Sequence, residues 1–238
     1  MKRFYKDTAV EAGDGGWYVL LDGKPMRTPA KAVLVAPTRA LADAIAKEWA
    51  DVPDKAEINI AHLPLTRLAA TGLDRVIPQR ERVIDDTAKY GDSDLLCYRA
   101  TQPVSLVQRQ QQAWQPLLDW AAERYGARLV VANGTTFVTQ PADAIAALRA
   151  AVAAHGDLAL SALYNLTHIA GSLVIALAVA EQRLSPSEAF TAAQLDELYQ
   201  IERWGSDPIA TKRHDGIKHD MNAGATFLAL LENHRLKG

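Results

Sequence analysis

The amino-acid sequence predicts an α+β fold, in which a small β-rich domain over residues 1–70 precedes a larger, all-helical domain over residues 71–238. Two observations support this prediction. Short aromatic and β-branched segments bounded by glycine turns occupy the first part of the chain. From about residue 65 onward, apolar residues recur at the three- and four-residue spacing of helices. The change from one pattern to the other falls within residues 60–80.

Tight turns define the predicted strands. Asp22-Gly23 predicts a type I′ hairpin turn, because both central positions of that turn need positive φ. Pro25 marks the return strand as an edge or irregular strand, and Gly13–Gly16 predicts a second turn. In the helical part, Asn133-Gly134 predicts another hairpin, between residues 128–131 and 135–139. The N-terminal strands are expected at Trp17–Leu21, Lys24–Thr28 and Ala32–Val35.

The first predicted helix begins after Thr38. The Thr38 hydroxyl can accept a hydrogen bond from a free backbone N–H of the first turn. Leu41, Ile45 and Trp49 then recur on one apolar face. Pro64 can begin the next helix, because the first turn does not need the N–H group that proline lacks.

Proline and glycine divide the rest of the chain into further helices. Pro78 separates two of them, and Pro116 is expected to kink or break a third. Ser185–Glu188 is a capping-box sequence that begins a helix running to Trp204, which Gly205 ends. Helices are therefore expected at residues 66–76, 79–89, 105–125, 142–154, 185–204 and 207–236.

A long stretch, Leu158–Ala180, contains no Asp, Glu, Lys or Arg and is long enough to span a bilayer. Asn165, Thr167 and His168 lie near its centre, where hydrocarbon would make each of them costly. We therefore expect one helix buried on nearly all sides, and no stable membrane insertion. His168 is expected to be a hydrogen-bonded core histidine.

Composition and charge exclude several classes of protein. The chain has 238 residues, is 49% hydrophobic and 23% charged, and carries a net charge of −2, without the basic excess of a nucleic-acid binder. Cys97 is the only cysteine, so neither an internal disulfide nor a cysteine metal cluster is expected. Its apolar neighbours predict a buried, inert thiol. Acidic residues from Asp7 onward replace the apolar stretch of a signal peptide, which predicts a cytoplasmic protein.

Catalytic motifs are weak in this sequence. It contains no Gly-rich phosphate loop and no GxSxG elbow, and no cofactor is expected. His214 and His219 are five residues apart, which separates them by about 140° around a helix; a polar, solvated helix start explains them better than a metal site. Asp92 and Asp94 lack the twelve-residue pattern of a calcium loop. A small metal-dependent or hydrolytic enzyme using these four residues is the alternative function, and it requires their side chains to converge in one pocket.

Asp196 and Glu197 form a pair of adjacent carboxylates. Consecutive residues diverge by about 100° around a helix, so the two acids cannot face each other across a substrate. They form either a solvated face or a charged patch that docks a partner protein.

The chain resembles the family of assembly chaperones for the alpha subunit of the F-type ATP synthase, the mitochondrial assembly factor 2 type. The likeness extends over nearly the whole chain, and the order and spacing of its parts make it specific. Leu198 stands where some relatives carry another acid. The matching segments are Arg3–Lys6, Leu21–Pro25 with Thr28-Pro29, Glu48-Trp49, Asp92–Arg99, Trp114–Pro116 with Trp120, and Glu197–Gly205.

The resemblance implies a non-catalytic, monomeric protein that binds free alpha subunit and prevents its aggregation until it meets the beta subunit. It implies a bacterial cytoplasmic location, or the matrix for a mitochondrial member. Trp49 occupies a family position that is sensitive to change, and its place on an apolar helix face favours a role in folding. The functionally important acid of the family maps to Asp196 or Glu197. The implied partner-binding residues are Asp196, Glu197, Gln200, Trp204, Asp92 and Asp94.

Overall fold

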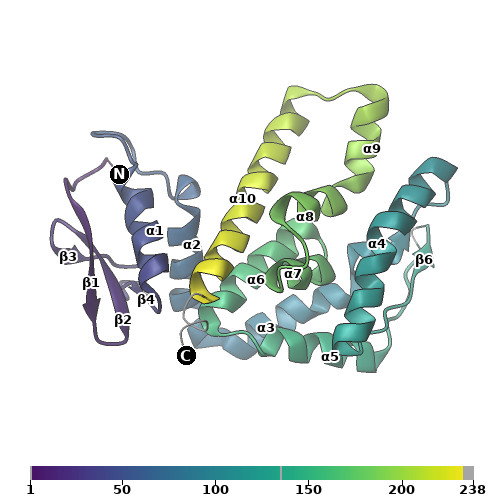
Figure 1. Cartoon of the computed structure of the whole chain (residues 1–238), viewed down its shortest axis with the longest axis horizontal. Coiled ribbons are helices and arrows are strands. Elements are labelled where there is room, and N and C mark those ends of the chain that lie inside the picture. Colours follow the sequence, from purple (N-terminus) through teal and green to yellow (C-terminus); the bar gives the residue numbers. More distant parts are fainter. Residues whose placement is uncertain (1, 135, 233–238) are drawn as a thin grey trace. The chain divides into compact units, whose positions relative to one another are not determined.

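The computed structural model describes residues 2–134 and 136–232. It confirms the α+β prediction: strands lie near the N-terminus, and helices make up most of the rest (Figure 1). Contacts divide the chain into two compact units, each described by itself below. The first comprises residues 1–80, 156–162 and 226–238, and the second comprises residues 81–155 and 163–225.

The sheet of the first unit is a small antiparallel one. Strand β2 pairs with β1 and β3 on its two sides, and β4 also pairs with β2. Asp22 and Gly23 have φ values of 48° and 76°, which confirms the predicted hairpin turn. The return strand is shorter than expected. The strands are β1 (Thr8–Gly13), β2 (Gly16–Leu21), β3 (Lys24–Pro25) and β4 (Val35–Ala36).

Helix α1 (Arg39–Ala50) lies against this sheet (Figure 1). As predicted, the Thr38 hydroxyl accepts a hydrogen bond from the Leu41 N–H, at 3.2 Å. Leu41, Ile45 and Trp49 are all buried on the face that the spacing predicted.

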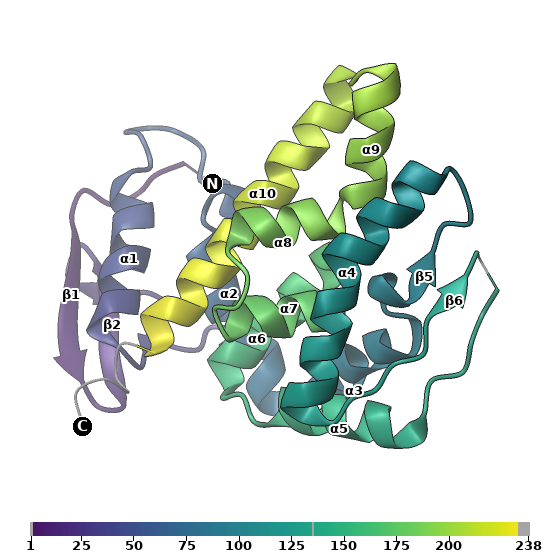
Figure 2. The same ribbon diagram turned by 45° about the vertical axis from the view of Figure 1, so that its right-hand side comes forward.

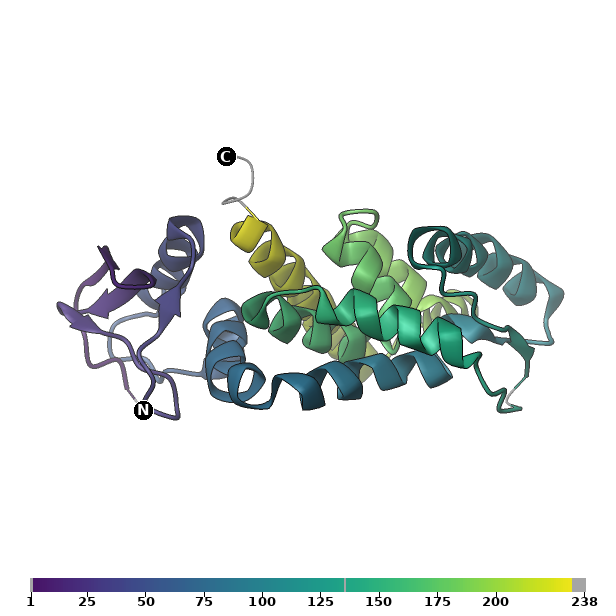
Figure 3. The ribbon, with the colours of Figure 1, turned by 90° about the horizontal axis from the view of Figure 1, so that it is seen from below.

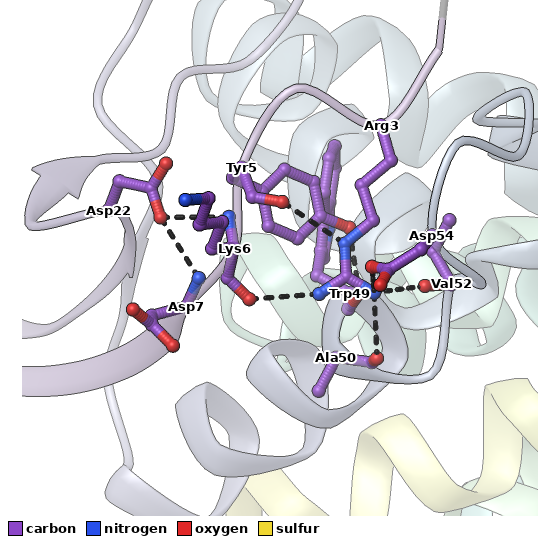
Figure 4. A network of polar contacts seen from close by, with 9 residues as sticks. All are labelled: Arg3, Tyr5, Lys6, Asp7, Asp22, Trp49, Ala50, Val52 and Asp54. Carbon is purple, nitrogen blue, oxygen red and sulfur yellow. Dashed lines mark hydrogen bonds and ion pairs between the residues drawn. The ribbon is translucent and has the colours of Figure 1, made fainter.

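Residues before the sheet close over the C-terminal end of α1 (Figure 4). The Arg3 guanidinium donates to the backbone oxygens of Ala50, at 3.4 Å, and of Val52. The Tyr5 hydroxyl donates to the Trp49 carbonyl oxygen at 2.7 Å, and the two rings lie 5.5 Å apart. Free carbonyl groups at the helix end thus receive donors from the N-terminal segment.

Helix α2 (Pro64–Thr71) begins at Pro64 as predicted. A π-helical turn over Gly72–Val76 and a 3₁₀ turn over Ile77–Gln79 connect it to α3 (Arg80–Ala88). Two helices separated at Pro78 were expected. Instead Pro78 lies in the 3₁₀ turn between the π-helical turn and α3.

Helix α4 (Val104–Tyr125) belongs to the second unit and continues through Pro116, so the expected break is wrong. Trp114 anchors this helix: its ring is buried, and its Nε1 donates to the Ala192 carbonyl oxygen at 2.9 Å. Helix α5 (Ala142–Ala153) ends where predicted and lies alongside α3 (Figure 3), to which it is joined by ion pairs of Arg149.

The uncharged stretch forms two helices, α6 (Asp157–Ala170) and α7 (Leu173–Ala180), rather than one. Gly171 has a φ of 64°, which suits glycine, and the Ser172 hydroxyl caps α7 by accepting from the Ile175 N–H at 3.1 Å. Every residue of α7 is buried, as expected. None of the described helices is both long and apolar enough to cross a membrane.

His168 does not lie in the core, so this prediction is wrong. Its side chain is exposed, and Nδ1 lies 2.7 Å from the Tyr90 hydroxyl. The apolar composition of the stretch concealed that α6 has an open face at this position.

The predicted helix from Ser185 to Trp204 is also two helices, α8 (Pro186–Ala193) and α9 (Leu195–Trp204), separated at Gln194. The capping box of Ser185 and Glu188 is confirmed, and Gly205 ends α9 with a φ of 86°. The last helix, α10, spans Pro208–Glu232; residues 233–236 of the predicted helix lie outside the described residues.

The predicted hairpin at Asn133-Gly134 is wrong. Strand β6 (Ala132–Asn133) pairs in parallel with β5 (Tyr98–Arg99), more than thirty residues earlier in the chain. The Gln140 side chain bonds both the N–H and the carbonyl oxygen of Val130, at 2.7 and 3.0 Å, so a hairpin partner cannot use them. Thr135 lies outside the described residues.

Candidate docking surface

Helix α9 presents an amphipathic surface, and Figure 2 shows it beside the N-terminal half of α4. Leu195 and Tyr199 are buried, whereas Gln200 and Trp204 are exposed, with 77% of Trp204 accessible. Two of the predicted docking residues, Gln200 and Trp204, therefore lie on the accessible side of this helix.

Asp196 is half-buried and faces α4. Its Oδ1 accepts a hydrogen bond from Gln110 Nε2 at 2.7 Å, and Gln110 Oε1 accepts from the Ala100 N–H at 2.7 Å. Gln110 is itself buried, so it holds the carboxylate in place. Among the described residues no hydrogen bond to Oδ2 is found, so this oxygen can accept one from another molecule.

Glu197 faces α10 instead. Its carboxylate is ion-paired with Arg213, and Oε1 lies 3.2 Å from Nε2 of His214. His214 is buried with its ring edge against Phe190, so the expectation of a solvated histidine is wrong. Burial, together with Arg213 and Lys218, holds the pKa of His214 below its usual range. The two acids thus diverge as the helical spacing predicts, but each meets a neighbouring helix rather than forming a solvated face.

Tyr199 is the centre of a cluster that joins α9 to α4. Its hydroxyl lies 2.6 Å from the Ser105 hydroxyl, and the guanidinium groups of Arg109 and Arg203 lie 5.2 and 4.5 Å from the ring centroid. Arg109 also pairs with Glu202 at 2.6 Å. Sequence reasoning missed Ser105 and Arg109, because they lie more than ninety residues before their partners in α9, Tyr199 and Glu202, and form no motif with them.

Asp92 and Asp94, which match the family motif, occupy different environments. Asp92 is exposed, whereas Asp94 has no exposed surface. The Asp94 carboxylate accepts hydrogen bonds from the N–H groups of Leu96, at 3.0 Å, and Val174, at 3.1 Å. It therefore caps the short helical turn at Leu95–Cys97 and the N-terminus of α7 together.

The residues of the alternative enzyme are dispersed among different surroundings. His214 packs against α9, His219 is exposed on α10, and Asp94 is buried at α7. Among the described residues, no group of three or more His, Cys, Asp or Glu side chains could hold a metal ion. Cys97 is buried as predicted, and burial raises the pKa of its thiol to about 12, which disfavours the reactive thiolate.

Comparisons with known proteins give concordant results. A family model described as ATP12 chaperone protein matches residues 2–122. The protein "atp12, mitochondrial" of Schizosaccharomyces pombe is 23% identical over 246 residues, covering 98% of this chain and 84% of that protein. The crystal structure of Atp12 from Paracoccus denitrificans has a TM-score of 0.89 and 39% identity, covering 97% of this chain and 98% of that chain. The crystal structure of the Atu1473 protein of Agrobacterium tumefaciens has a TM-score of 0.91 and 42% identity, covering 97% of this chain and 86% of that chain.

Proposed function

Because the chain belongs to the ATP12 chaperone protein family, we propose that it binds the free alpha subunit of the F-type ATP synthase catalytic head. Binding keeps that subunit from aggregating until the beta subunit joins it. An unassembled subunit of a hetero-oligomer exposes apolar interface, which is an aggregation hazard. The observation that carries the proposal is the surface of α9. There Gln200 and Trp204 are exposed, and a hydrogen bond from Gln110 holds the Asp196 carboxylate in place.

We assign the docking carboxylate to Asp196 rather than Glu197. Glu197 is already paired with Arg213 across the α9–α10 contact, and a partner would have to displace that arginine. Asp196 is oriented by a neutral amide and keeps an oxygen for a basic group of the alpha subunit. The exposed Asp92 is a second docking acid, and Asp94 contributes by holding the segment that carries it.

Replacing Asp196 with asparagine is expected to weaken alpha-subunit binding about ten- to hundredfold, because a charge-assisted contact is lost. Asparagine retains an acceptor for the Gln110 amide, so the melting temperature should stay unchanged. The matched variant Glu197→Gln should lower the melting temperature slightly and leave binding intact. Titration calorimetry and circular dichroism measure the two effects; the opposite pattern would identify Glu197 as the docking acid.

The proposed function itself is tested by co-purification with isolated alpha subunit and, separately, with isolated beta subunit. Selective retention of alpha, together with suppression of its light scattering on dilution from denaturant, is the expected result. Retention of neither subunit would show that the proposal is wrong.

The same proposal includes a monomeric, non-catalytic protein that needs no cofactor. It works in the cytoplasm of a bacterium, or in the matrix if the chain is mitochondrial. A chaperone that is later displaced must bind its subunit selectively and still release it. The rate of dissociation decides how readily the subunit is released.

A further inference from the structure

A stripe of three residues runs along α9 where it meets α4. Asp196, Tyr199 and Arg203 are at positions i, i+3 and i+7, so they share one face of the helix. At 1.5 Å of rise per residue, the acid and the base at the two ends lie about 10 Å apart along the helix axis. Tyr199 between them is buried.

Arg203, at the basic end of this stripe, is held in place by contacts other than an ion pair. The Arg203 guanidinium lies 4.5 Å from the Tyr199 ring centroid, and Nη2 donates to the Ser105 hydroxyl at 3.1 Å. Both contacts are to uncharged groups, and within the described residues no ion pair of Arg203 is found. Arg109, on the same ring, differs because Glu202 neutralises it. Arg203 is exposed and keeps most of its five N–H donors for another molecule.

Apolar side chains accompany the basic end. Trp204 follows Arg203 and is 77% exposed, and Val104 precedes Ser105 and is 70% exposed. Tryptophan and arginine are the residue types most often found at energetic hot spots of protein interfaces.

We infer that this α4–α9 face (Val104, Ser105, Asp196, Tyr199, Arg203 and Trp204) binds a bipolar segment of its partner. The segment places a cation at Asp196 and, about 10 Å further on, a carboxylate at Arg203 with an apolar side chain beside it for Trp204. Two turns of a helix or three residues of an extended strand provide that spacing. That the segment belongs to the alpha subunit rests on the proposed function.

The arrangement of charges explains how one helix can select both a partner and its direction. A single acid would attract any basic surface, in either orientation. An acid and a base at opposite ends favour only one direction, because reversing the segment brings like charges together, which is unfavourable.

The test is a charge reversal at the basic end. Arg203→Glu is expected to weaken binding of isolated alpha subunit by about ten- to hundredfold, and to reduce its dependence on salt. Arg128→Glu is the matched control. It makes the same charge change in the same unit, at an exposed position just beyond the opposite end of the 22-residue helix α4. Arg203→Gln removes the charge but can still donate to Ser105, so it separates the loss of charge from any loss of folding.

Calorimetric titrations below the melting temperature of every variant distinguish the possible results. Weakened binding by both Arg203 variants, with wild-type affinity for Arg128→Glu, supports the bipolar segment. Unchanged binding by Arg203→Gln, or an equal loss for Arg128→Glu, would overturn it while leaving the chaperone proposal intact. Failure of the wild-type protein to bind alpha subunit would refute the proposed function, and this inference with it.

Discussion

Replacing Trp49 with alanine is expected to lower the free energy of unfolding by about 3–5 kcal/mol, the usual cost of removing a buried tryptophan. The side chain is 6% exposed. Its Nε1 donates to the Thr66 hydroxyl at 2.9 Å, and its ring packs 5.5 Å from that of Tyr5. The substitution would therefore leave a cavity between α1, α2 and the N-terminal segment of the first unit. Urea denaturation followed by circular dichroism measures the effect.

Trp49→Phe is the control for this prediction. It keeps an aromatic ring but loses the N–H donor, and Thr66 still bonds the Glu48 carboxylate at 2.8 Å. We expect a smaller loss, of about 1–2 kcal/mol. An alanine variant that unfolds like the wild type yet fails to bind alpha subunit would place Trp49 in docking rather than folding.

Local signals in the sequence were sufficient for many parts of the fold. The Thr38 cap, the Asp22-Gly23 turn and the Ser185 capping box were all predicted correctly, because each depends on residues within a few positions of one another. The break between α6 and α7 was not predicted. Apolar composition extends across it, and Gly171-Ser172 resembles an ordinary small pair within a helix.

Long-range pairing explains the other errors. Asn133-Gly134 has the composition of a hairpin turn, but β6 pairs with β5, and no feature near residue 133 indicates that partner. His168 is exposed on α6, with Tyr90 beside it, which composition alone does not reveal. Such outcomes depend on which elements meet, and the sequence around each residue carries little of that information.

The candidate site was predicted in part. Spacing indicated that Asp196 and Glu197 diverge, and the structure shows the separate neighbours that result, Gln110 and Arg213. The cluster around Tyr199 could not be anticipated, because its α4 members are remote in sequence. The amphipathic pattern of α9 indicates that one side is buried, but not which helix covers it.

The Asp94→Ala variant is expected to lose about 2–4 kcal/mol of unfolding free energy at neutral pH. Without the carboxylate, the buried N–H groups of Leu96 and Val174 would lack their acceptor, at a cost of about 1–3 kcal/mol each. Relief of the buried charge offsets part of this loss. Asp92→Ala, two residues earlier and exposed, is the matched control and should change stability by less than about 0.5 kcal/mol. Equal effects of the two substitutions would contradict a capping role.

The ionisation of Asp94 should also make stability depend on pH in a distinctive direction. Burial raises its pKa to about 6, although hydrogen bonds from Ser172 and from backbone N–H groups act to lower it. Because this pKa lies above the unfolded value of about 3.9, the stabilisation due to proton binding is complete below about pH 4 and is lost as the pH rises through about 6. Wild type should therefore gain about 2–3 kcal/mol relative to Asp94→Asn, which cannot titrate, when the pH falls from 7 to 4. Urea titrations of both proteins across this range measure their free energies of unfolding. If the value for wild type minus that for Asp94→Asn stays constant or falls on acidification, the folded-state pKa is not raised.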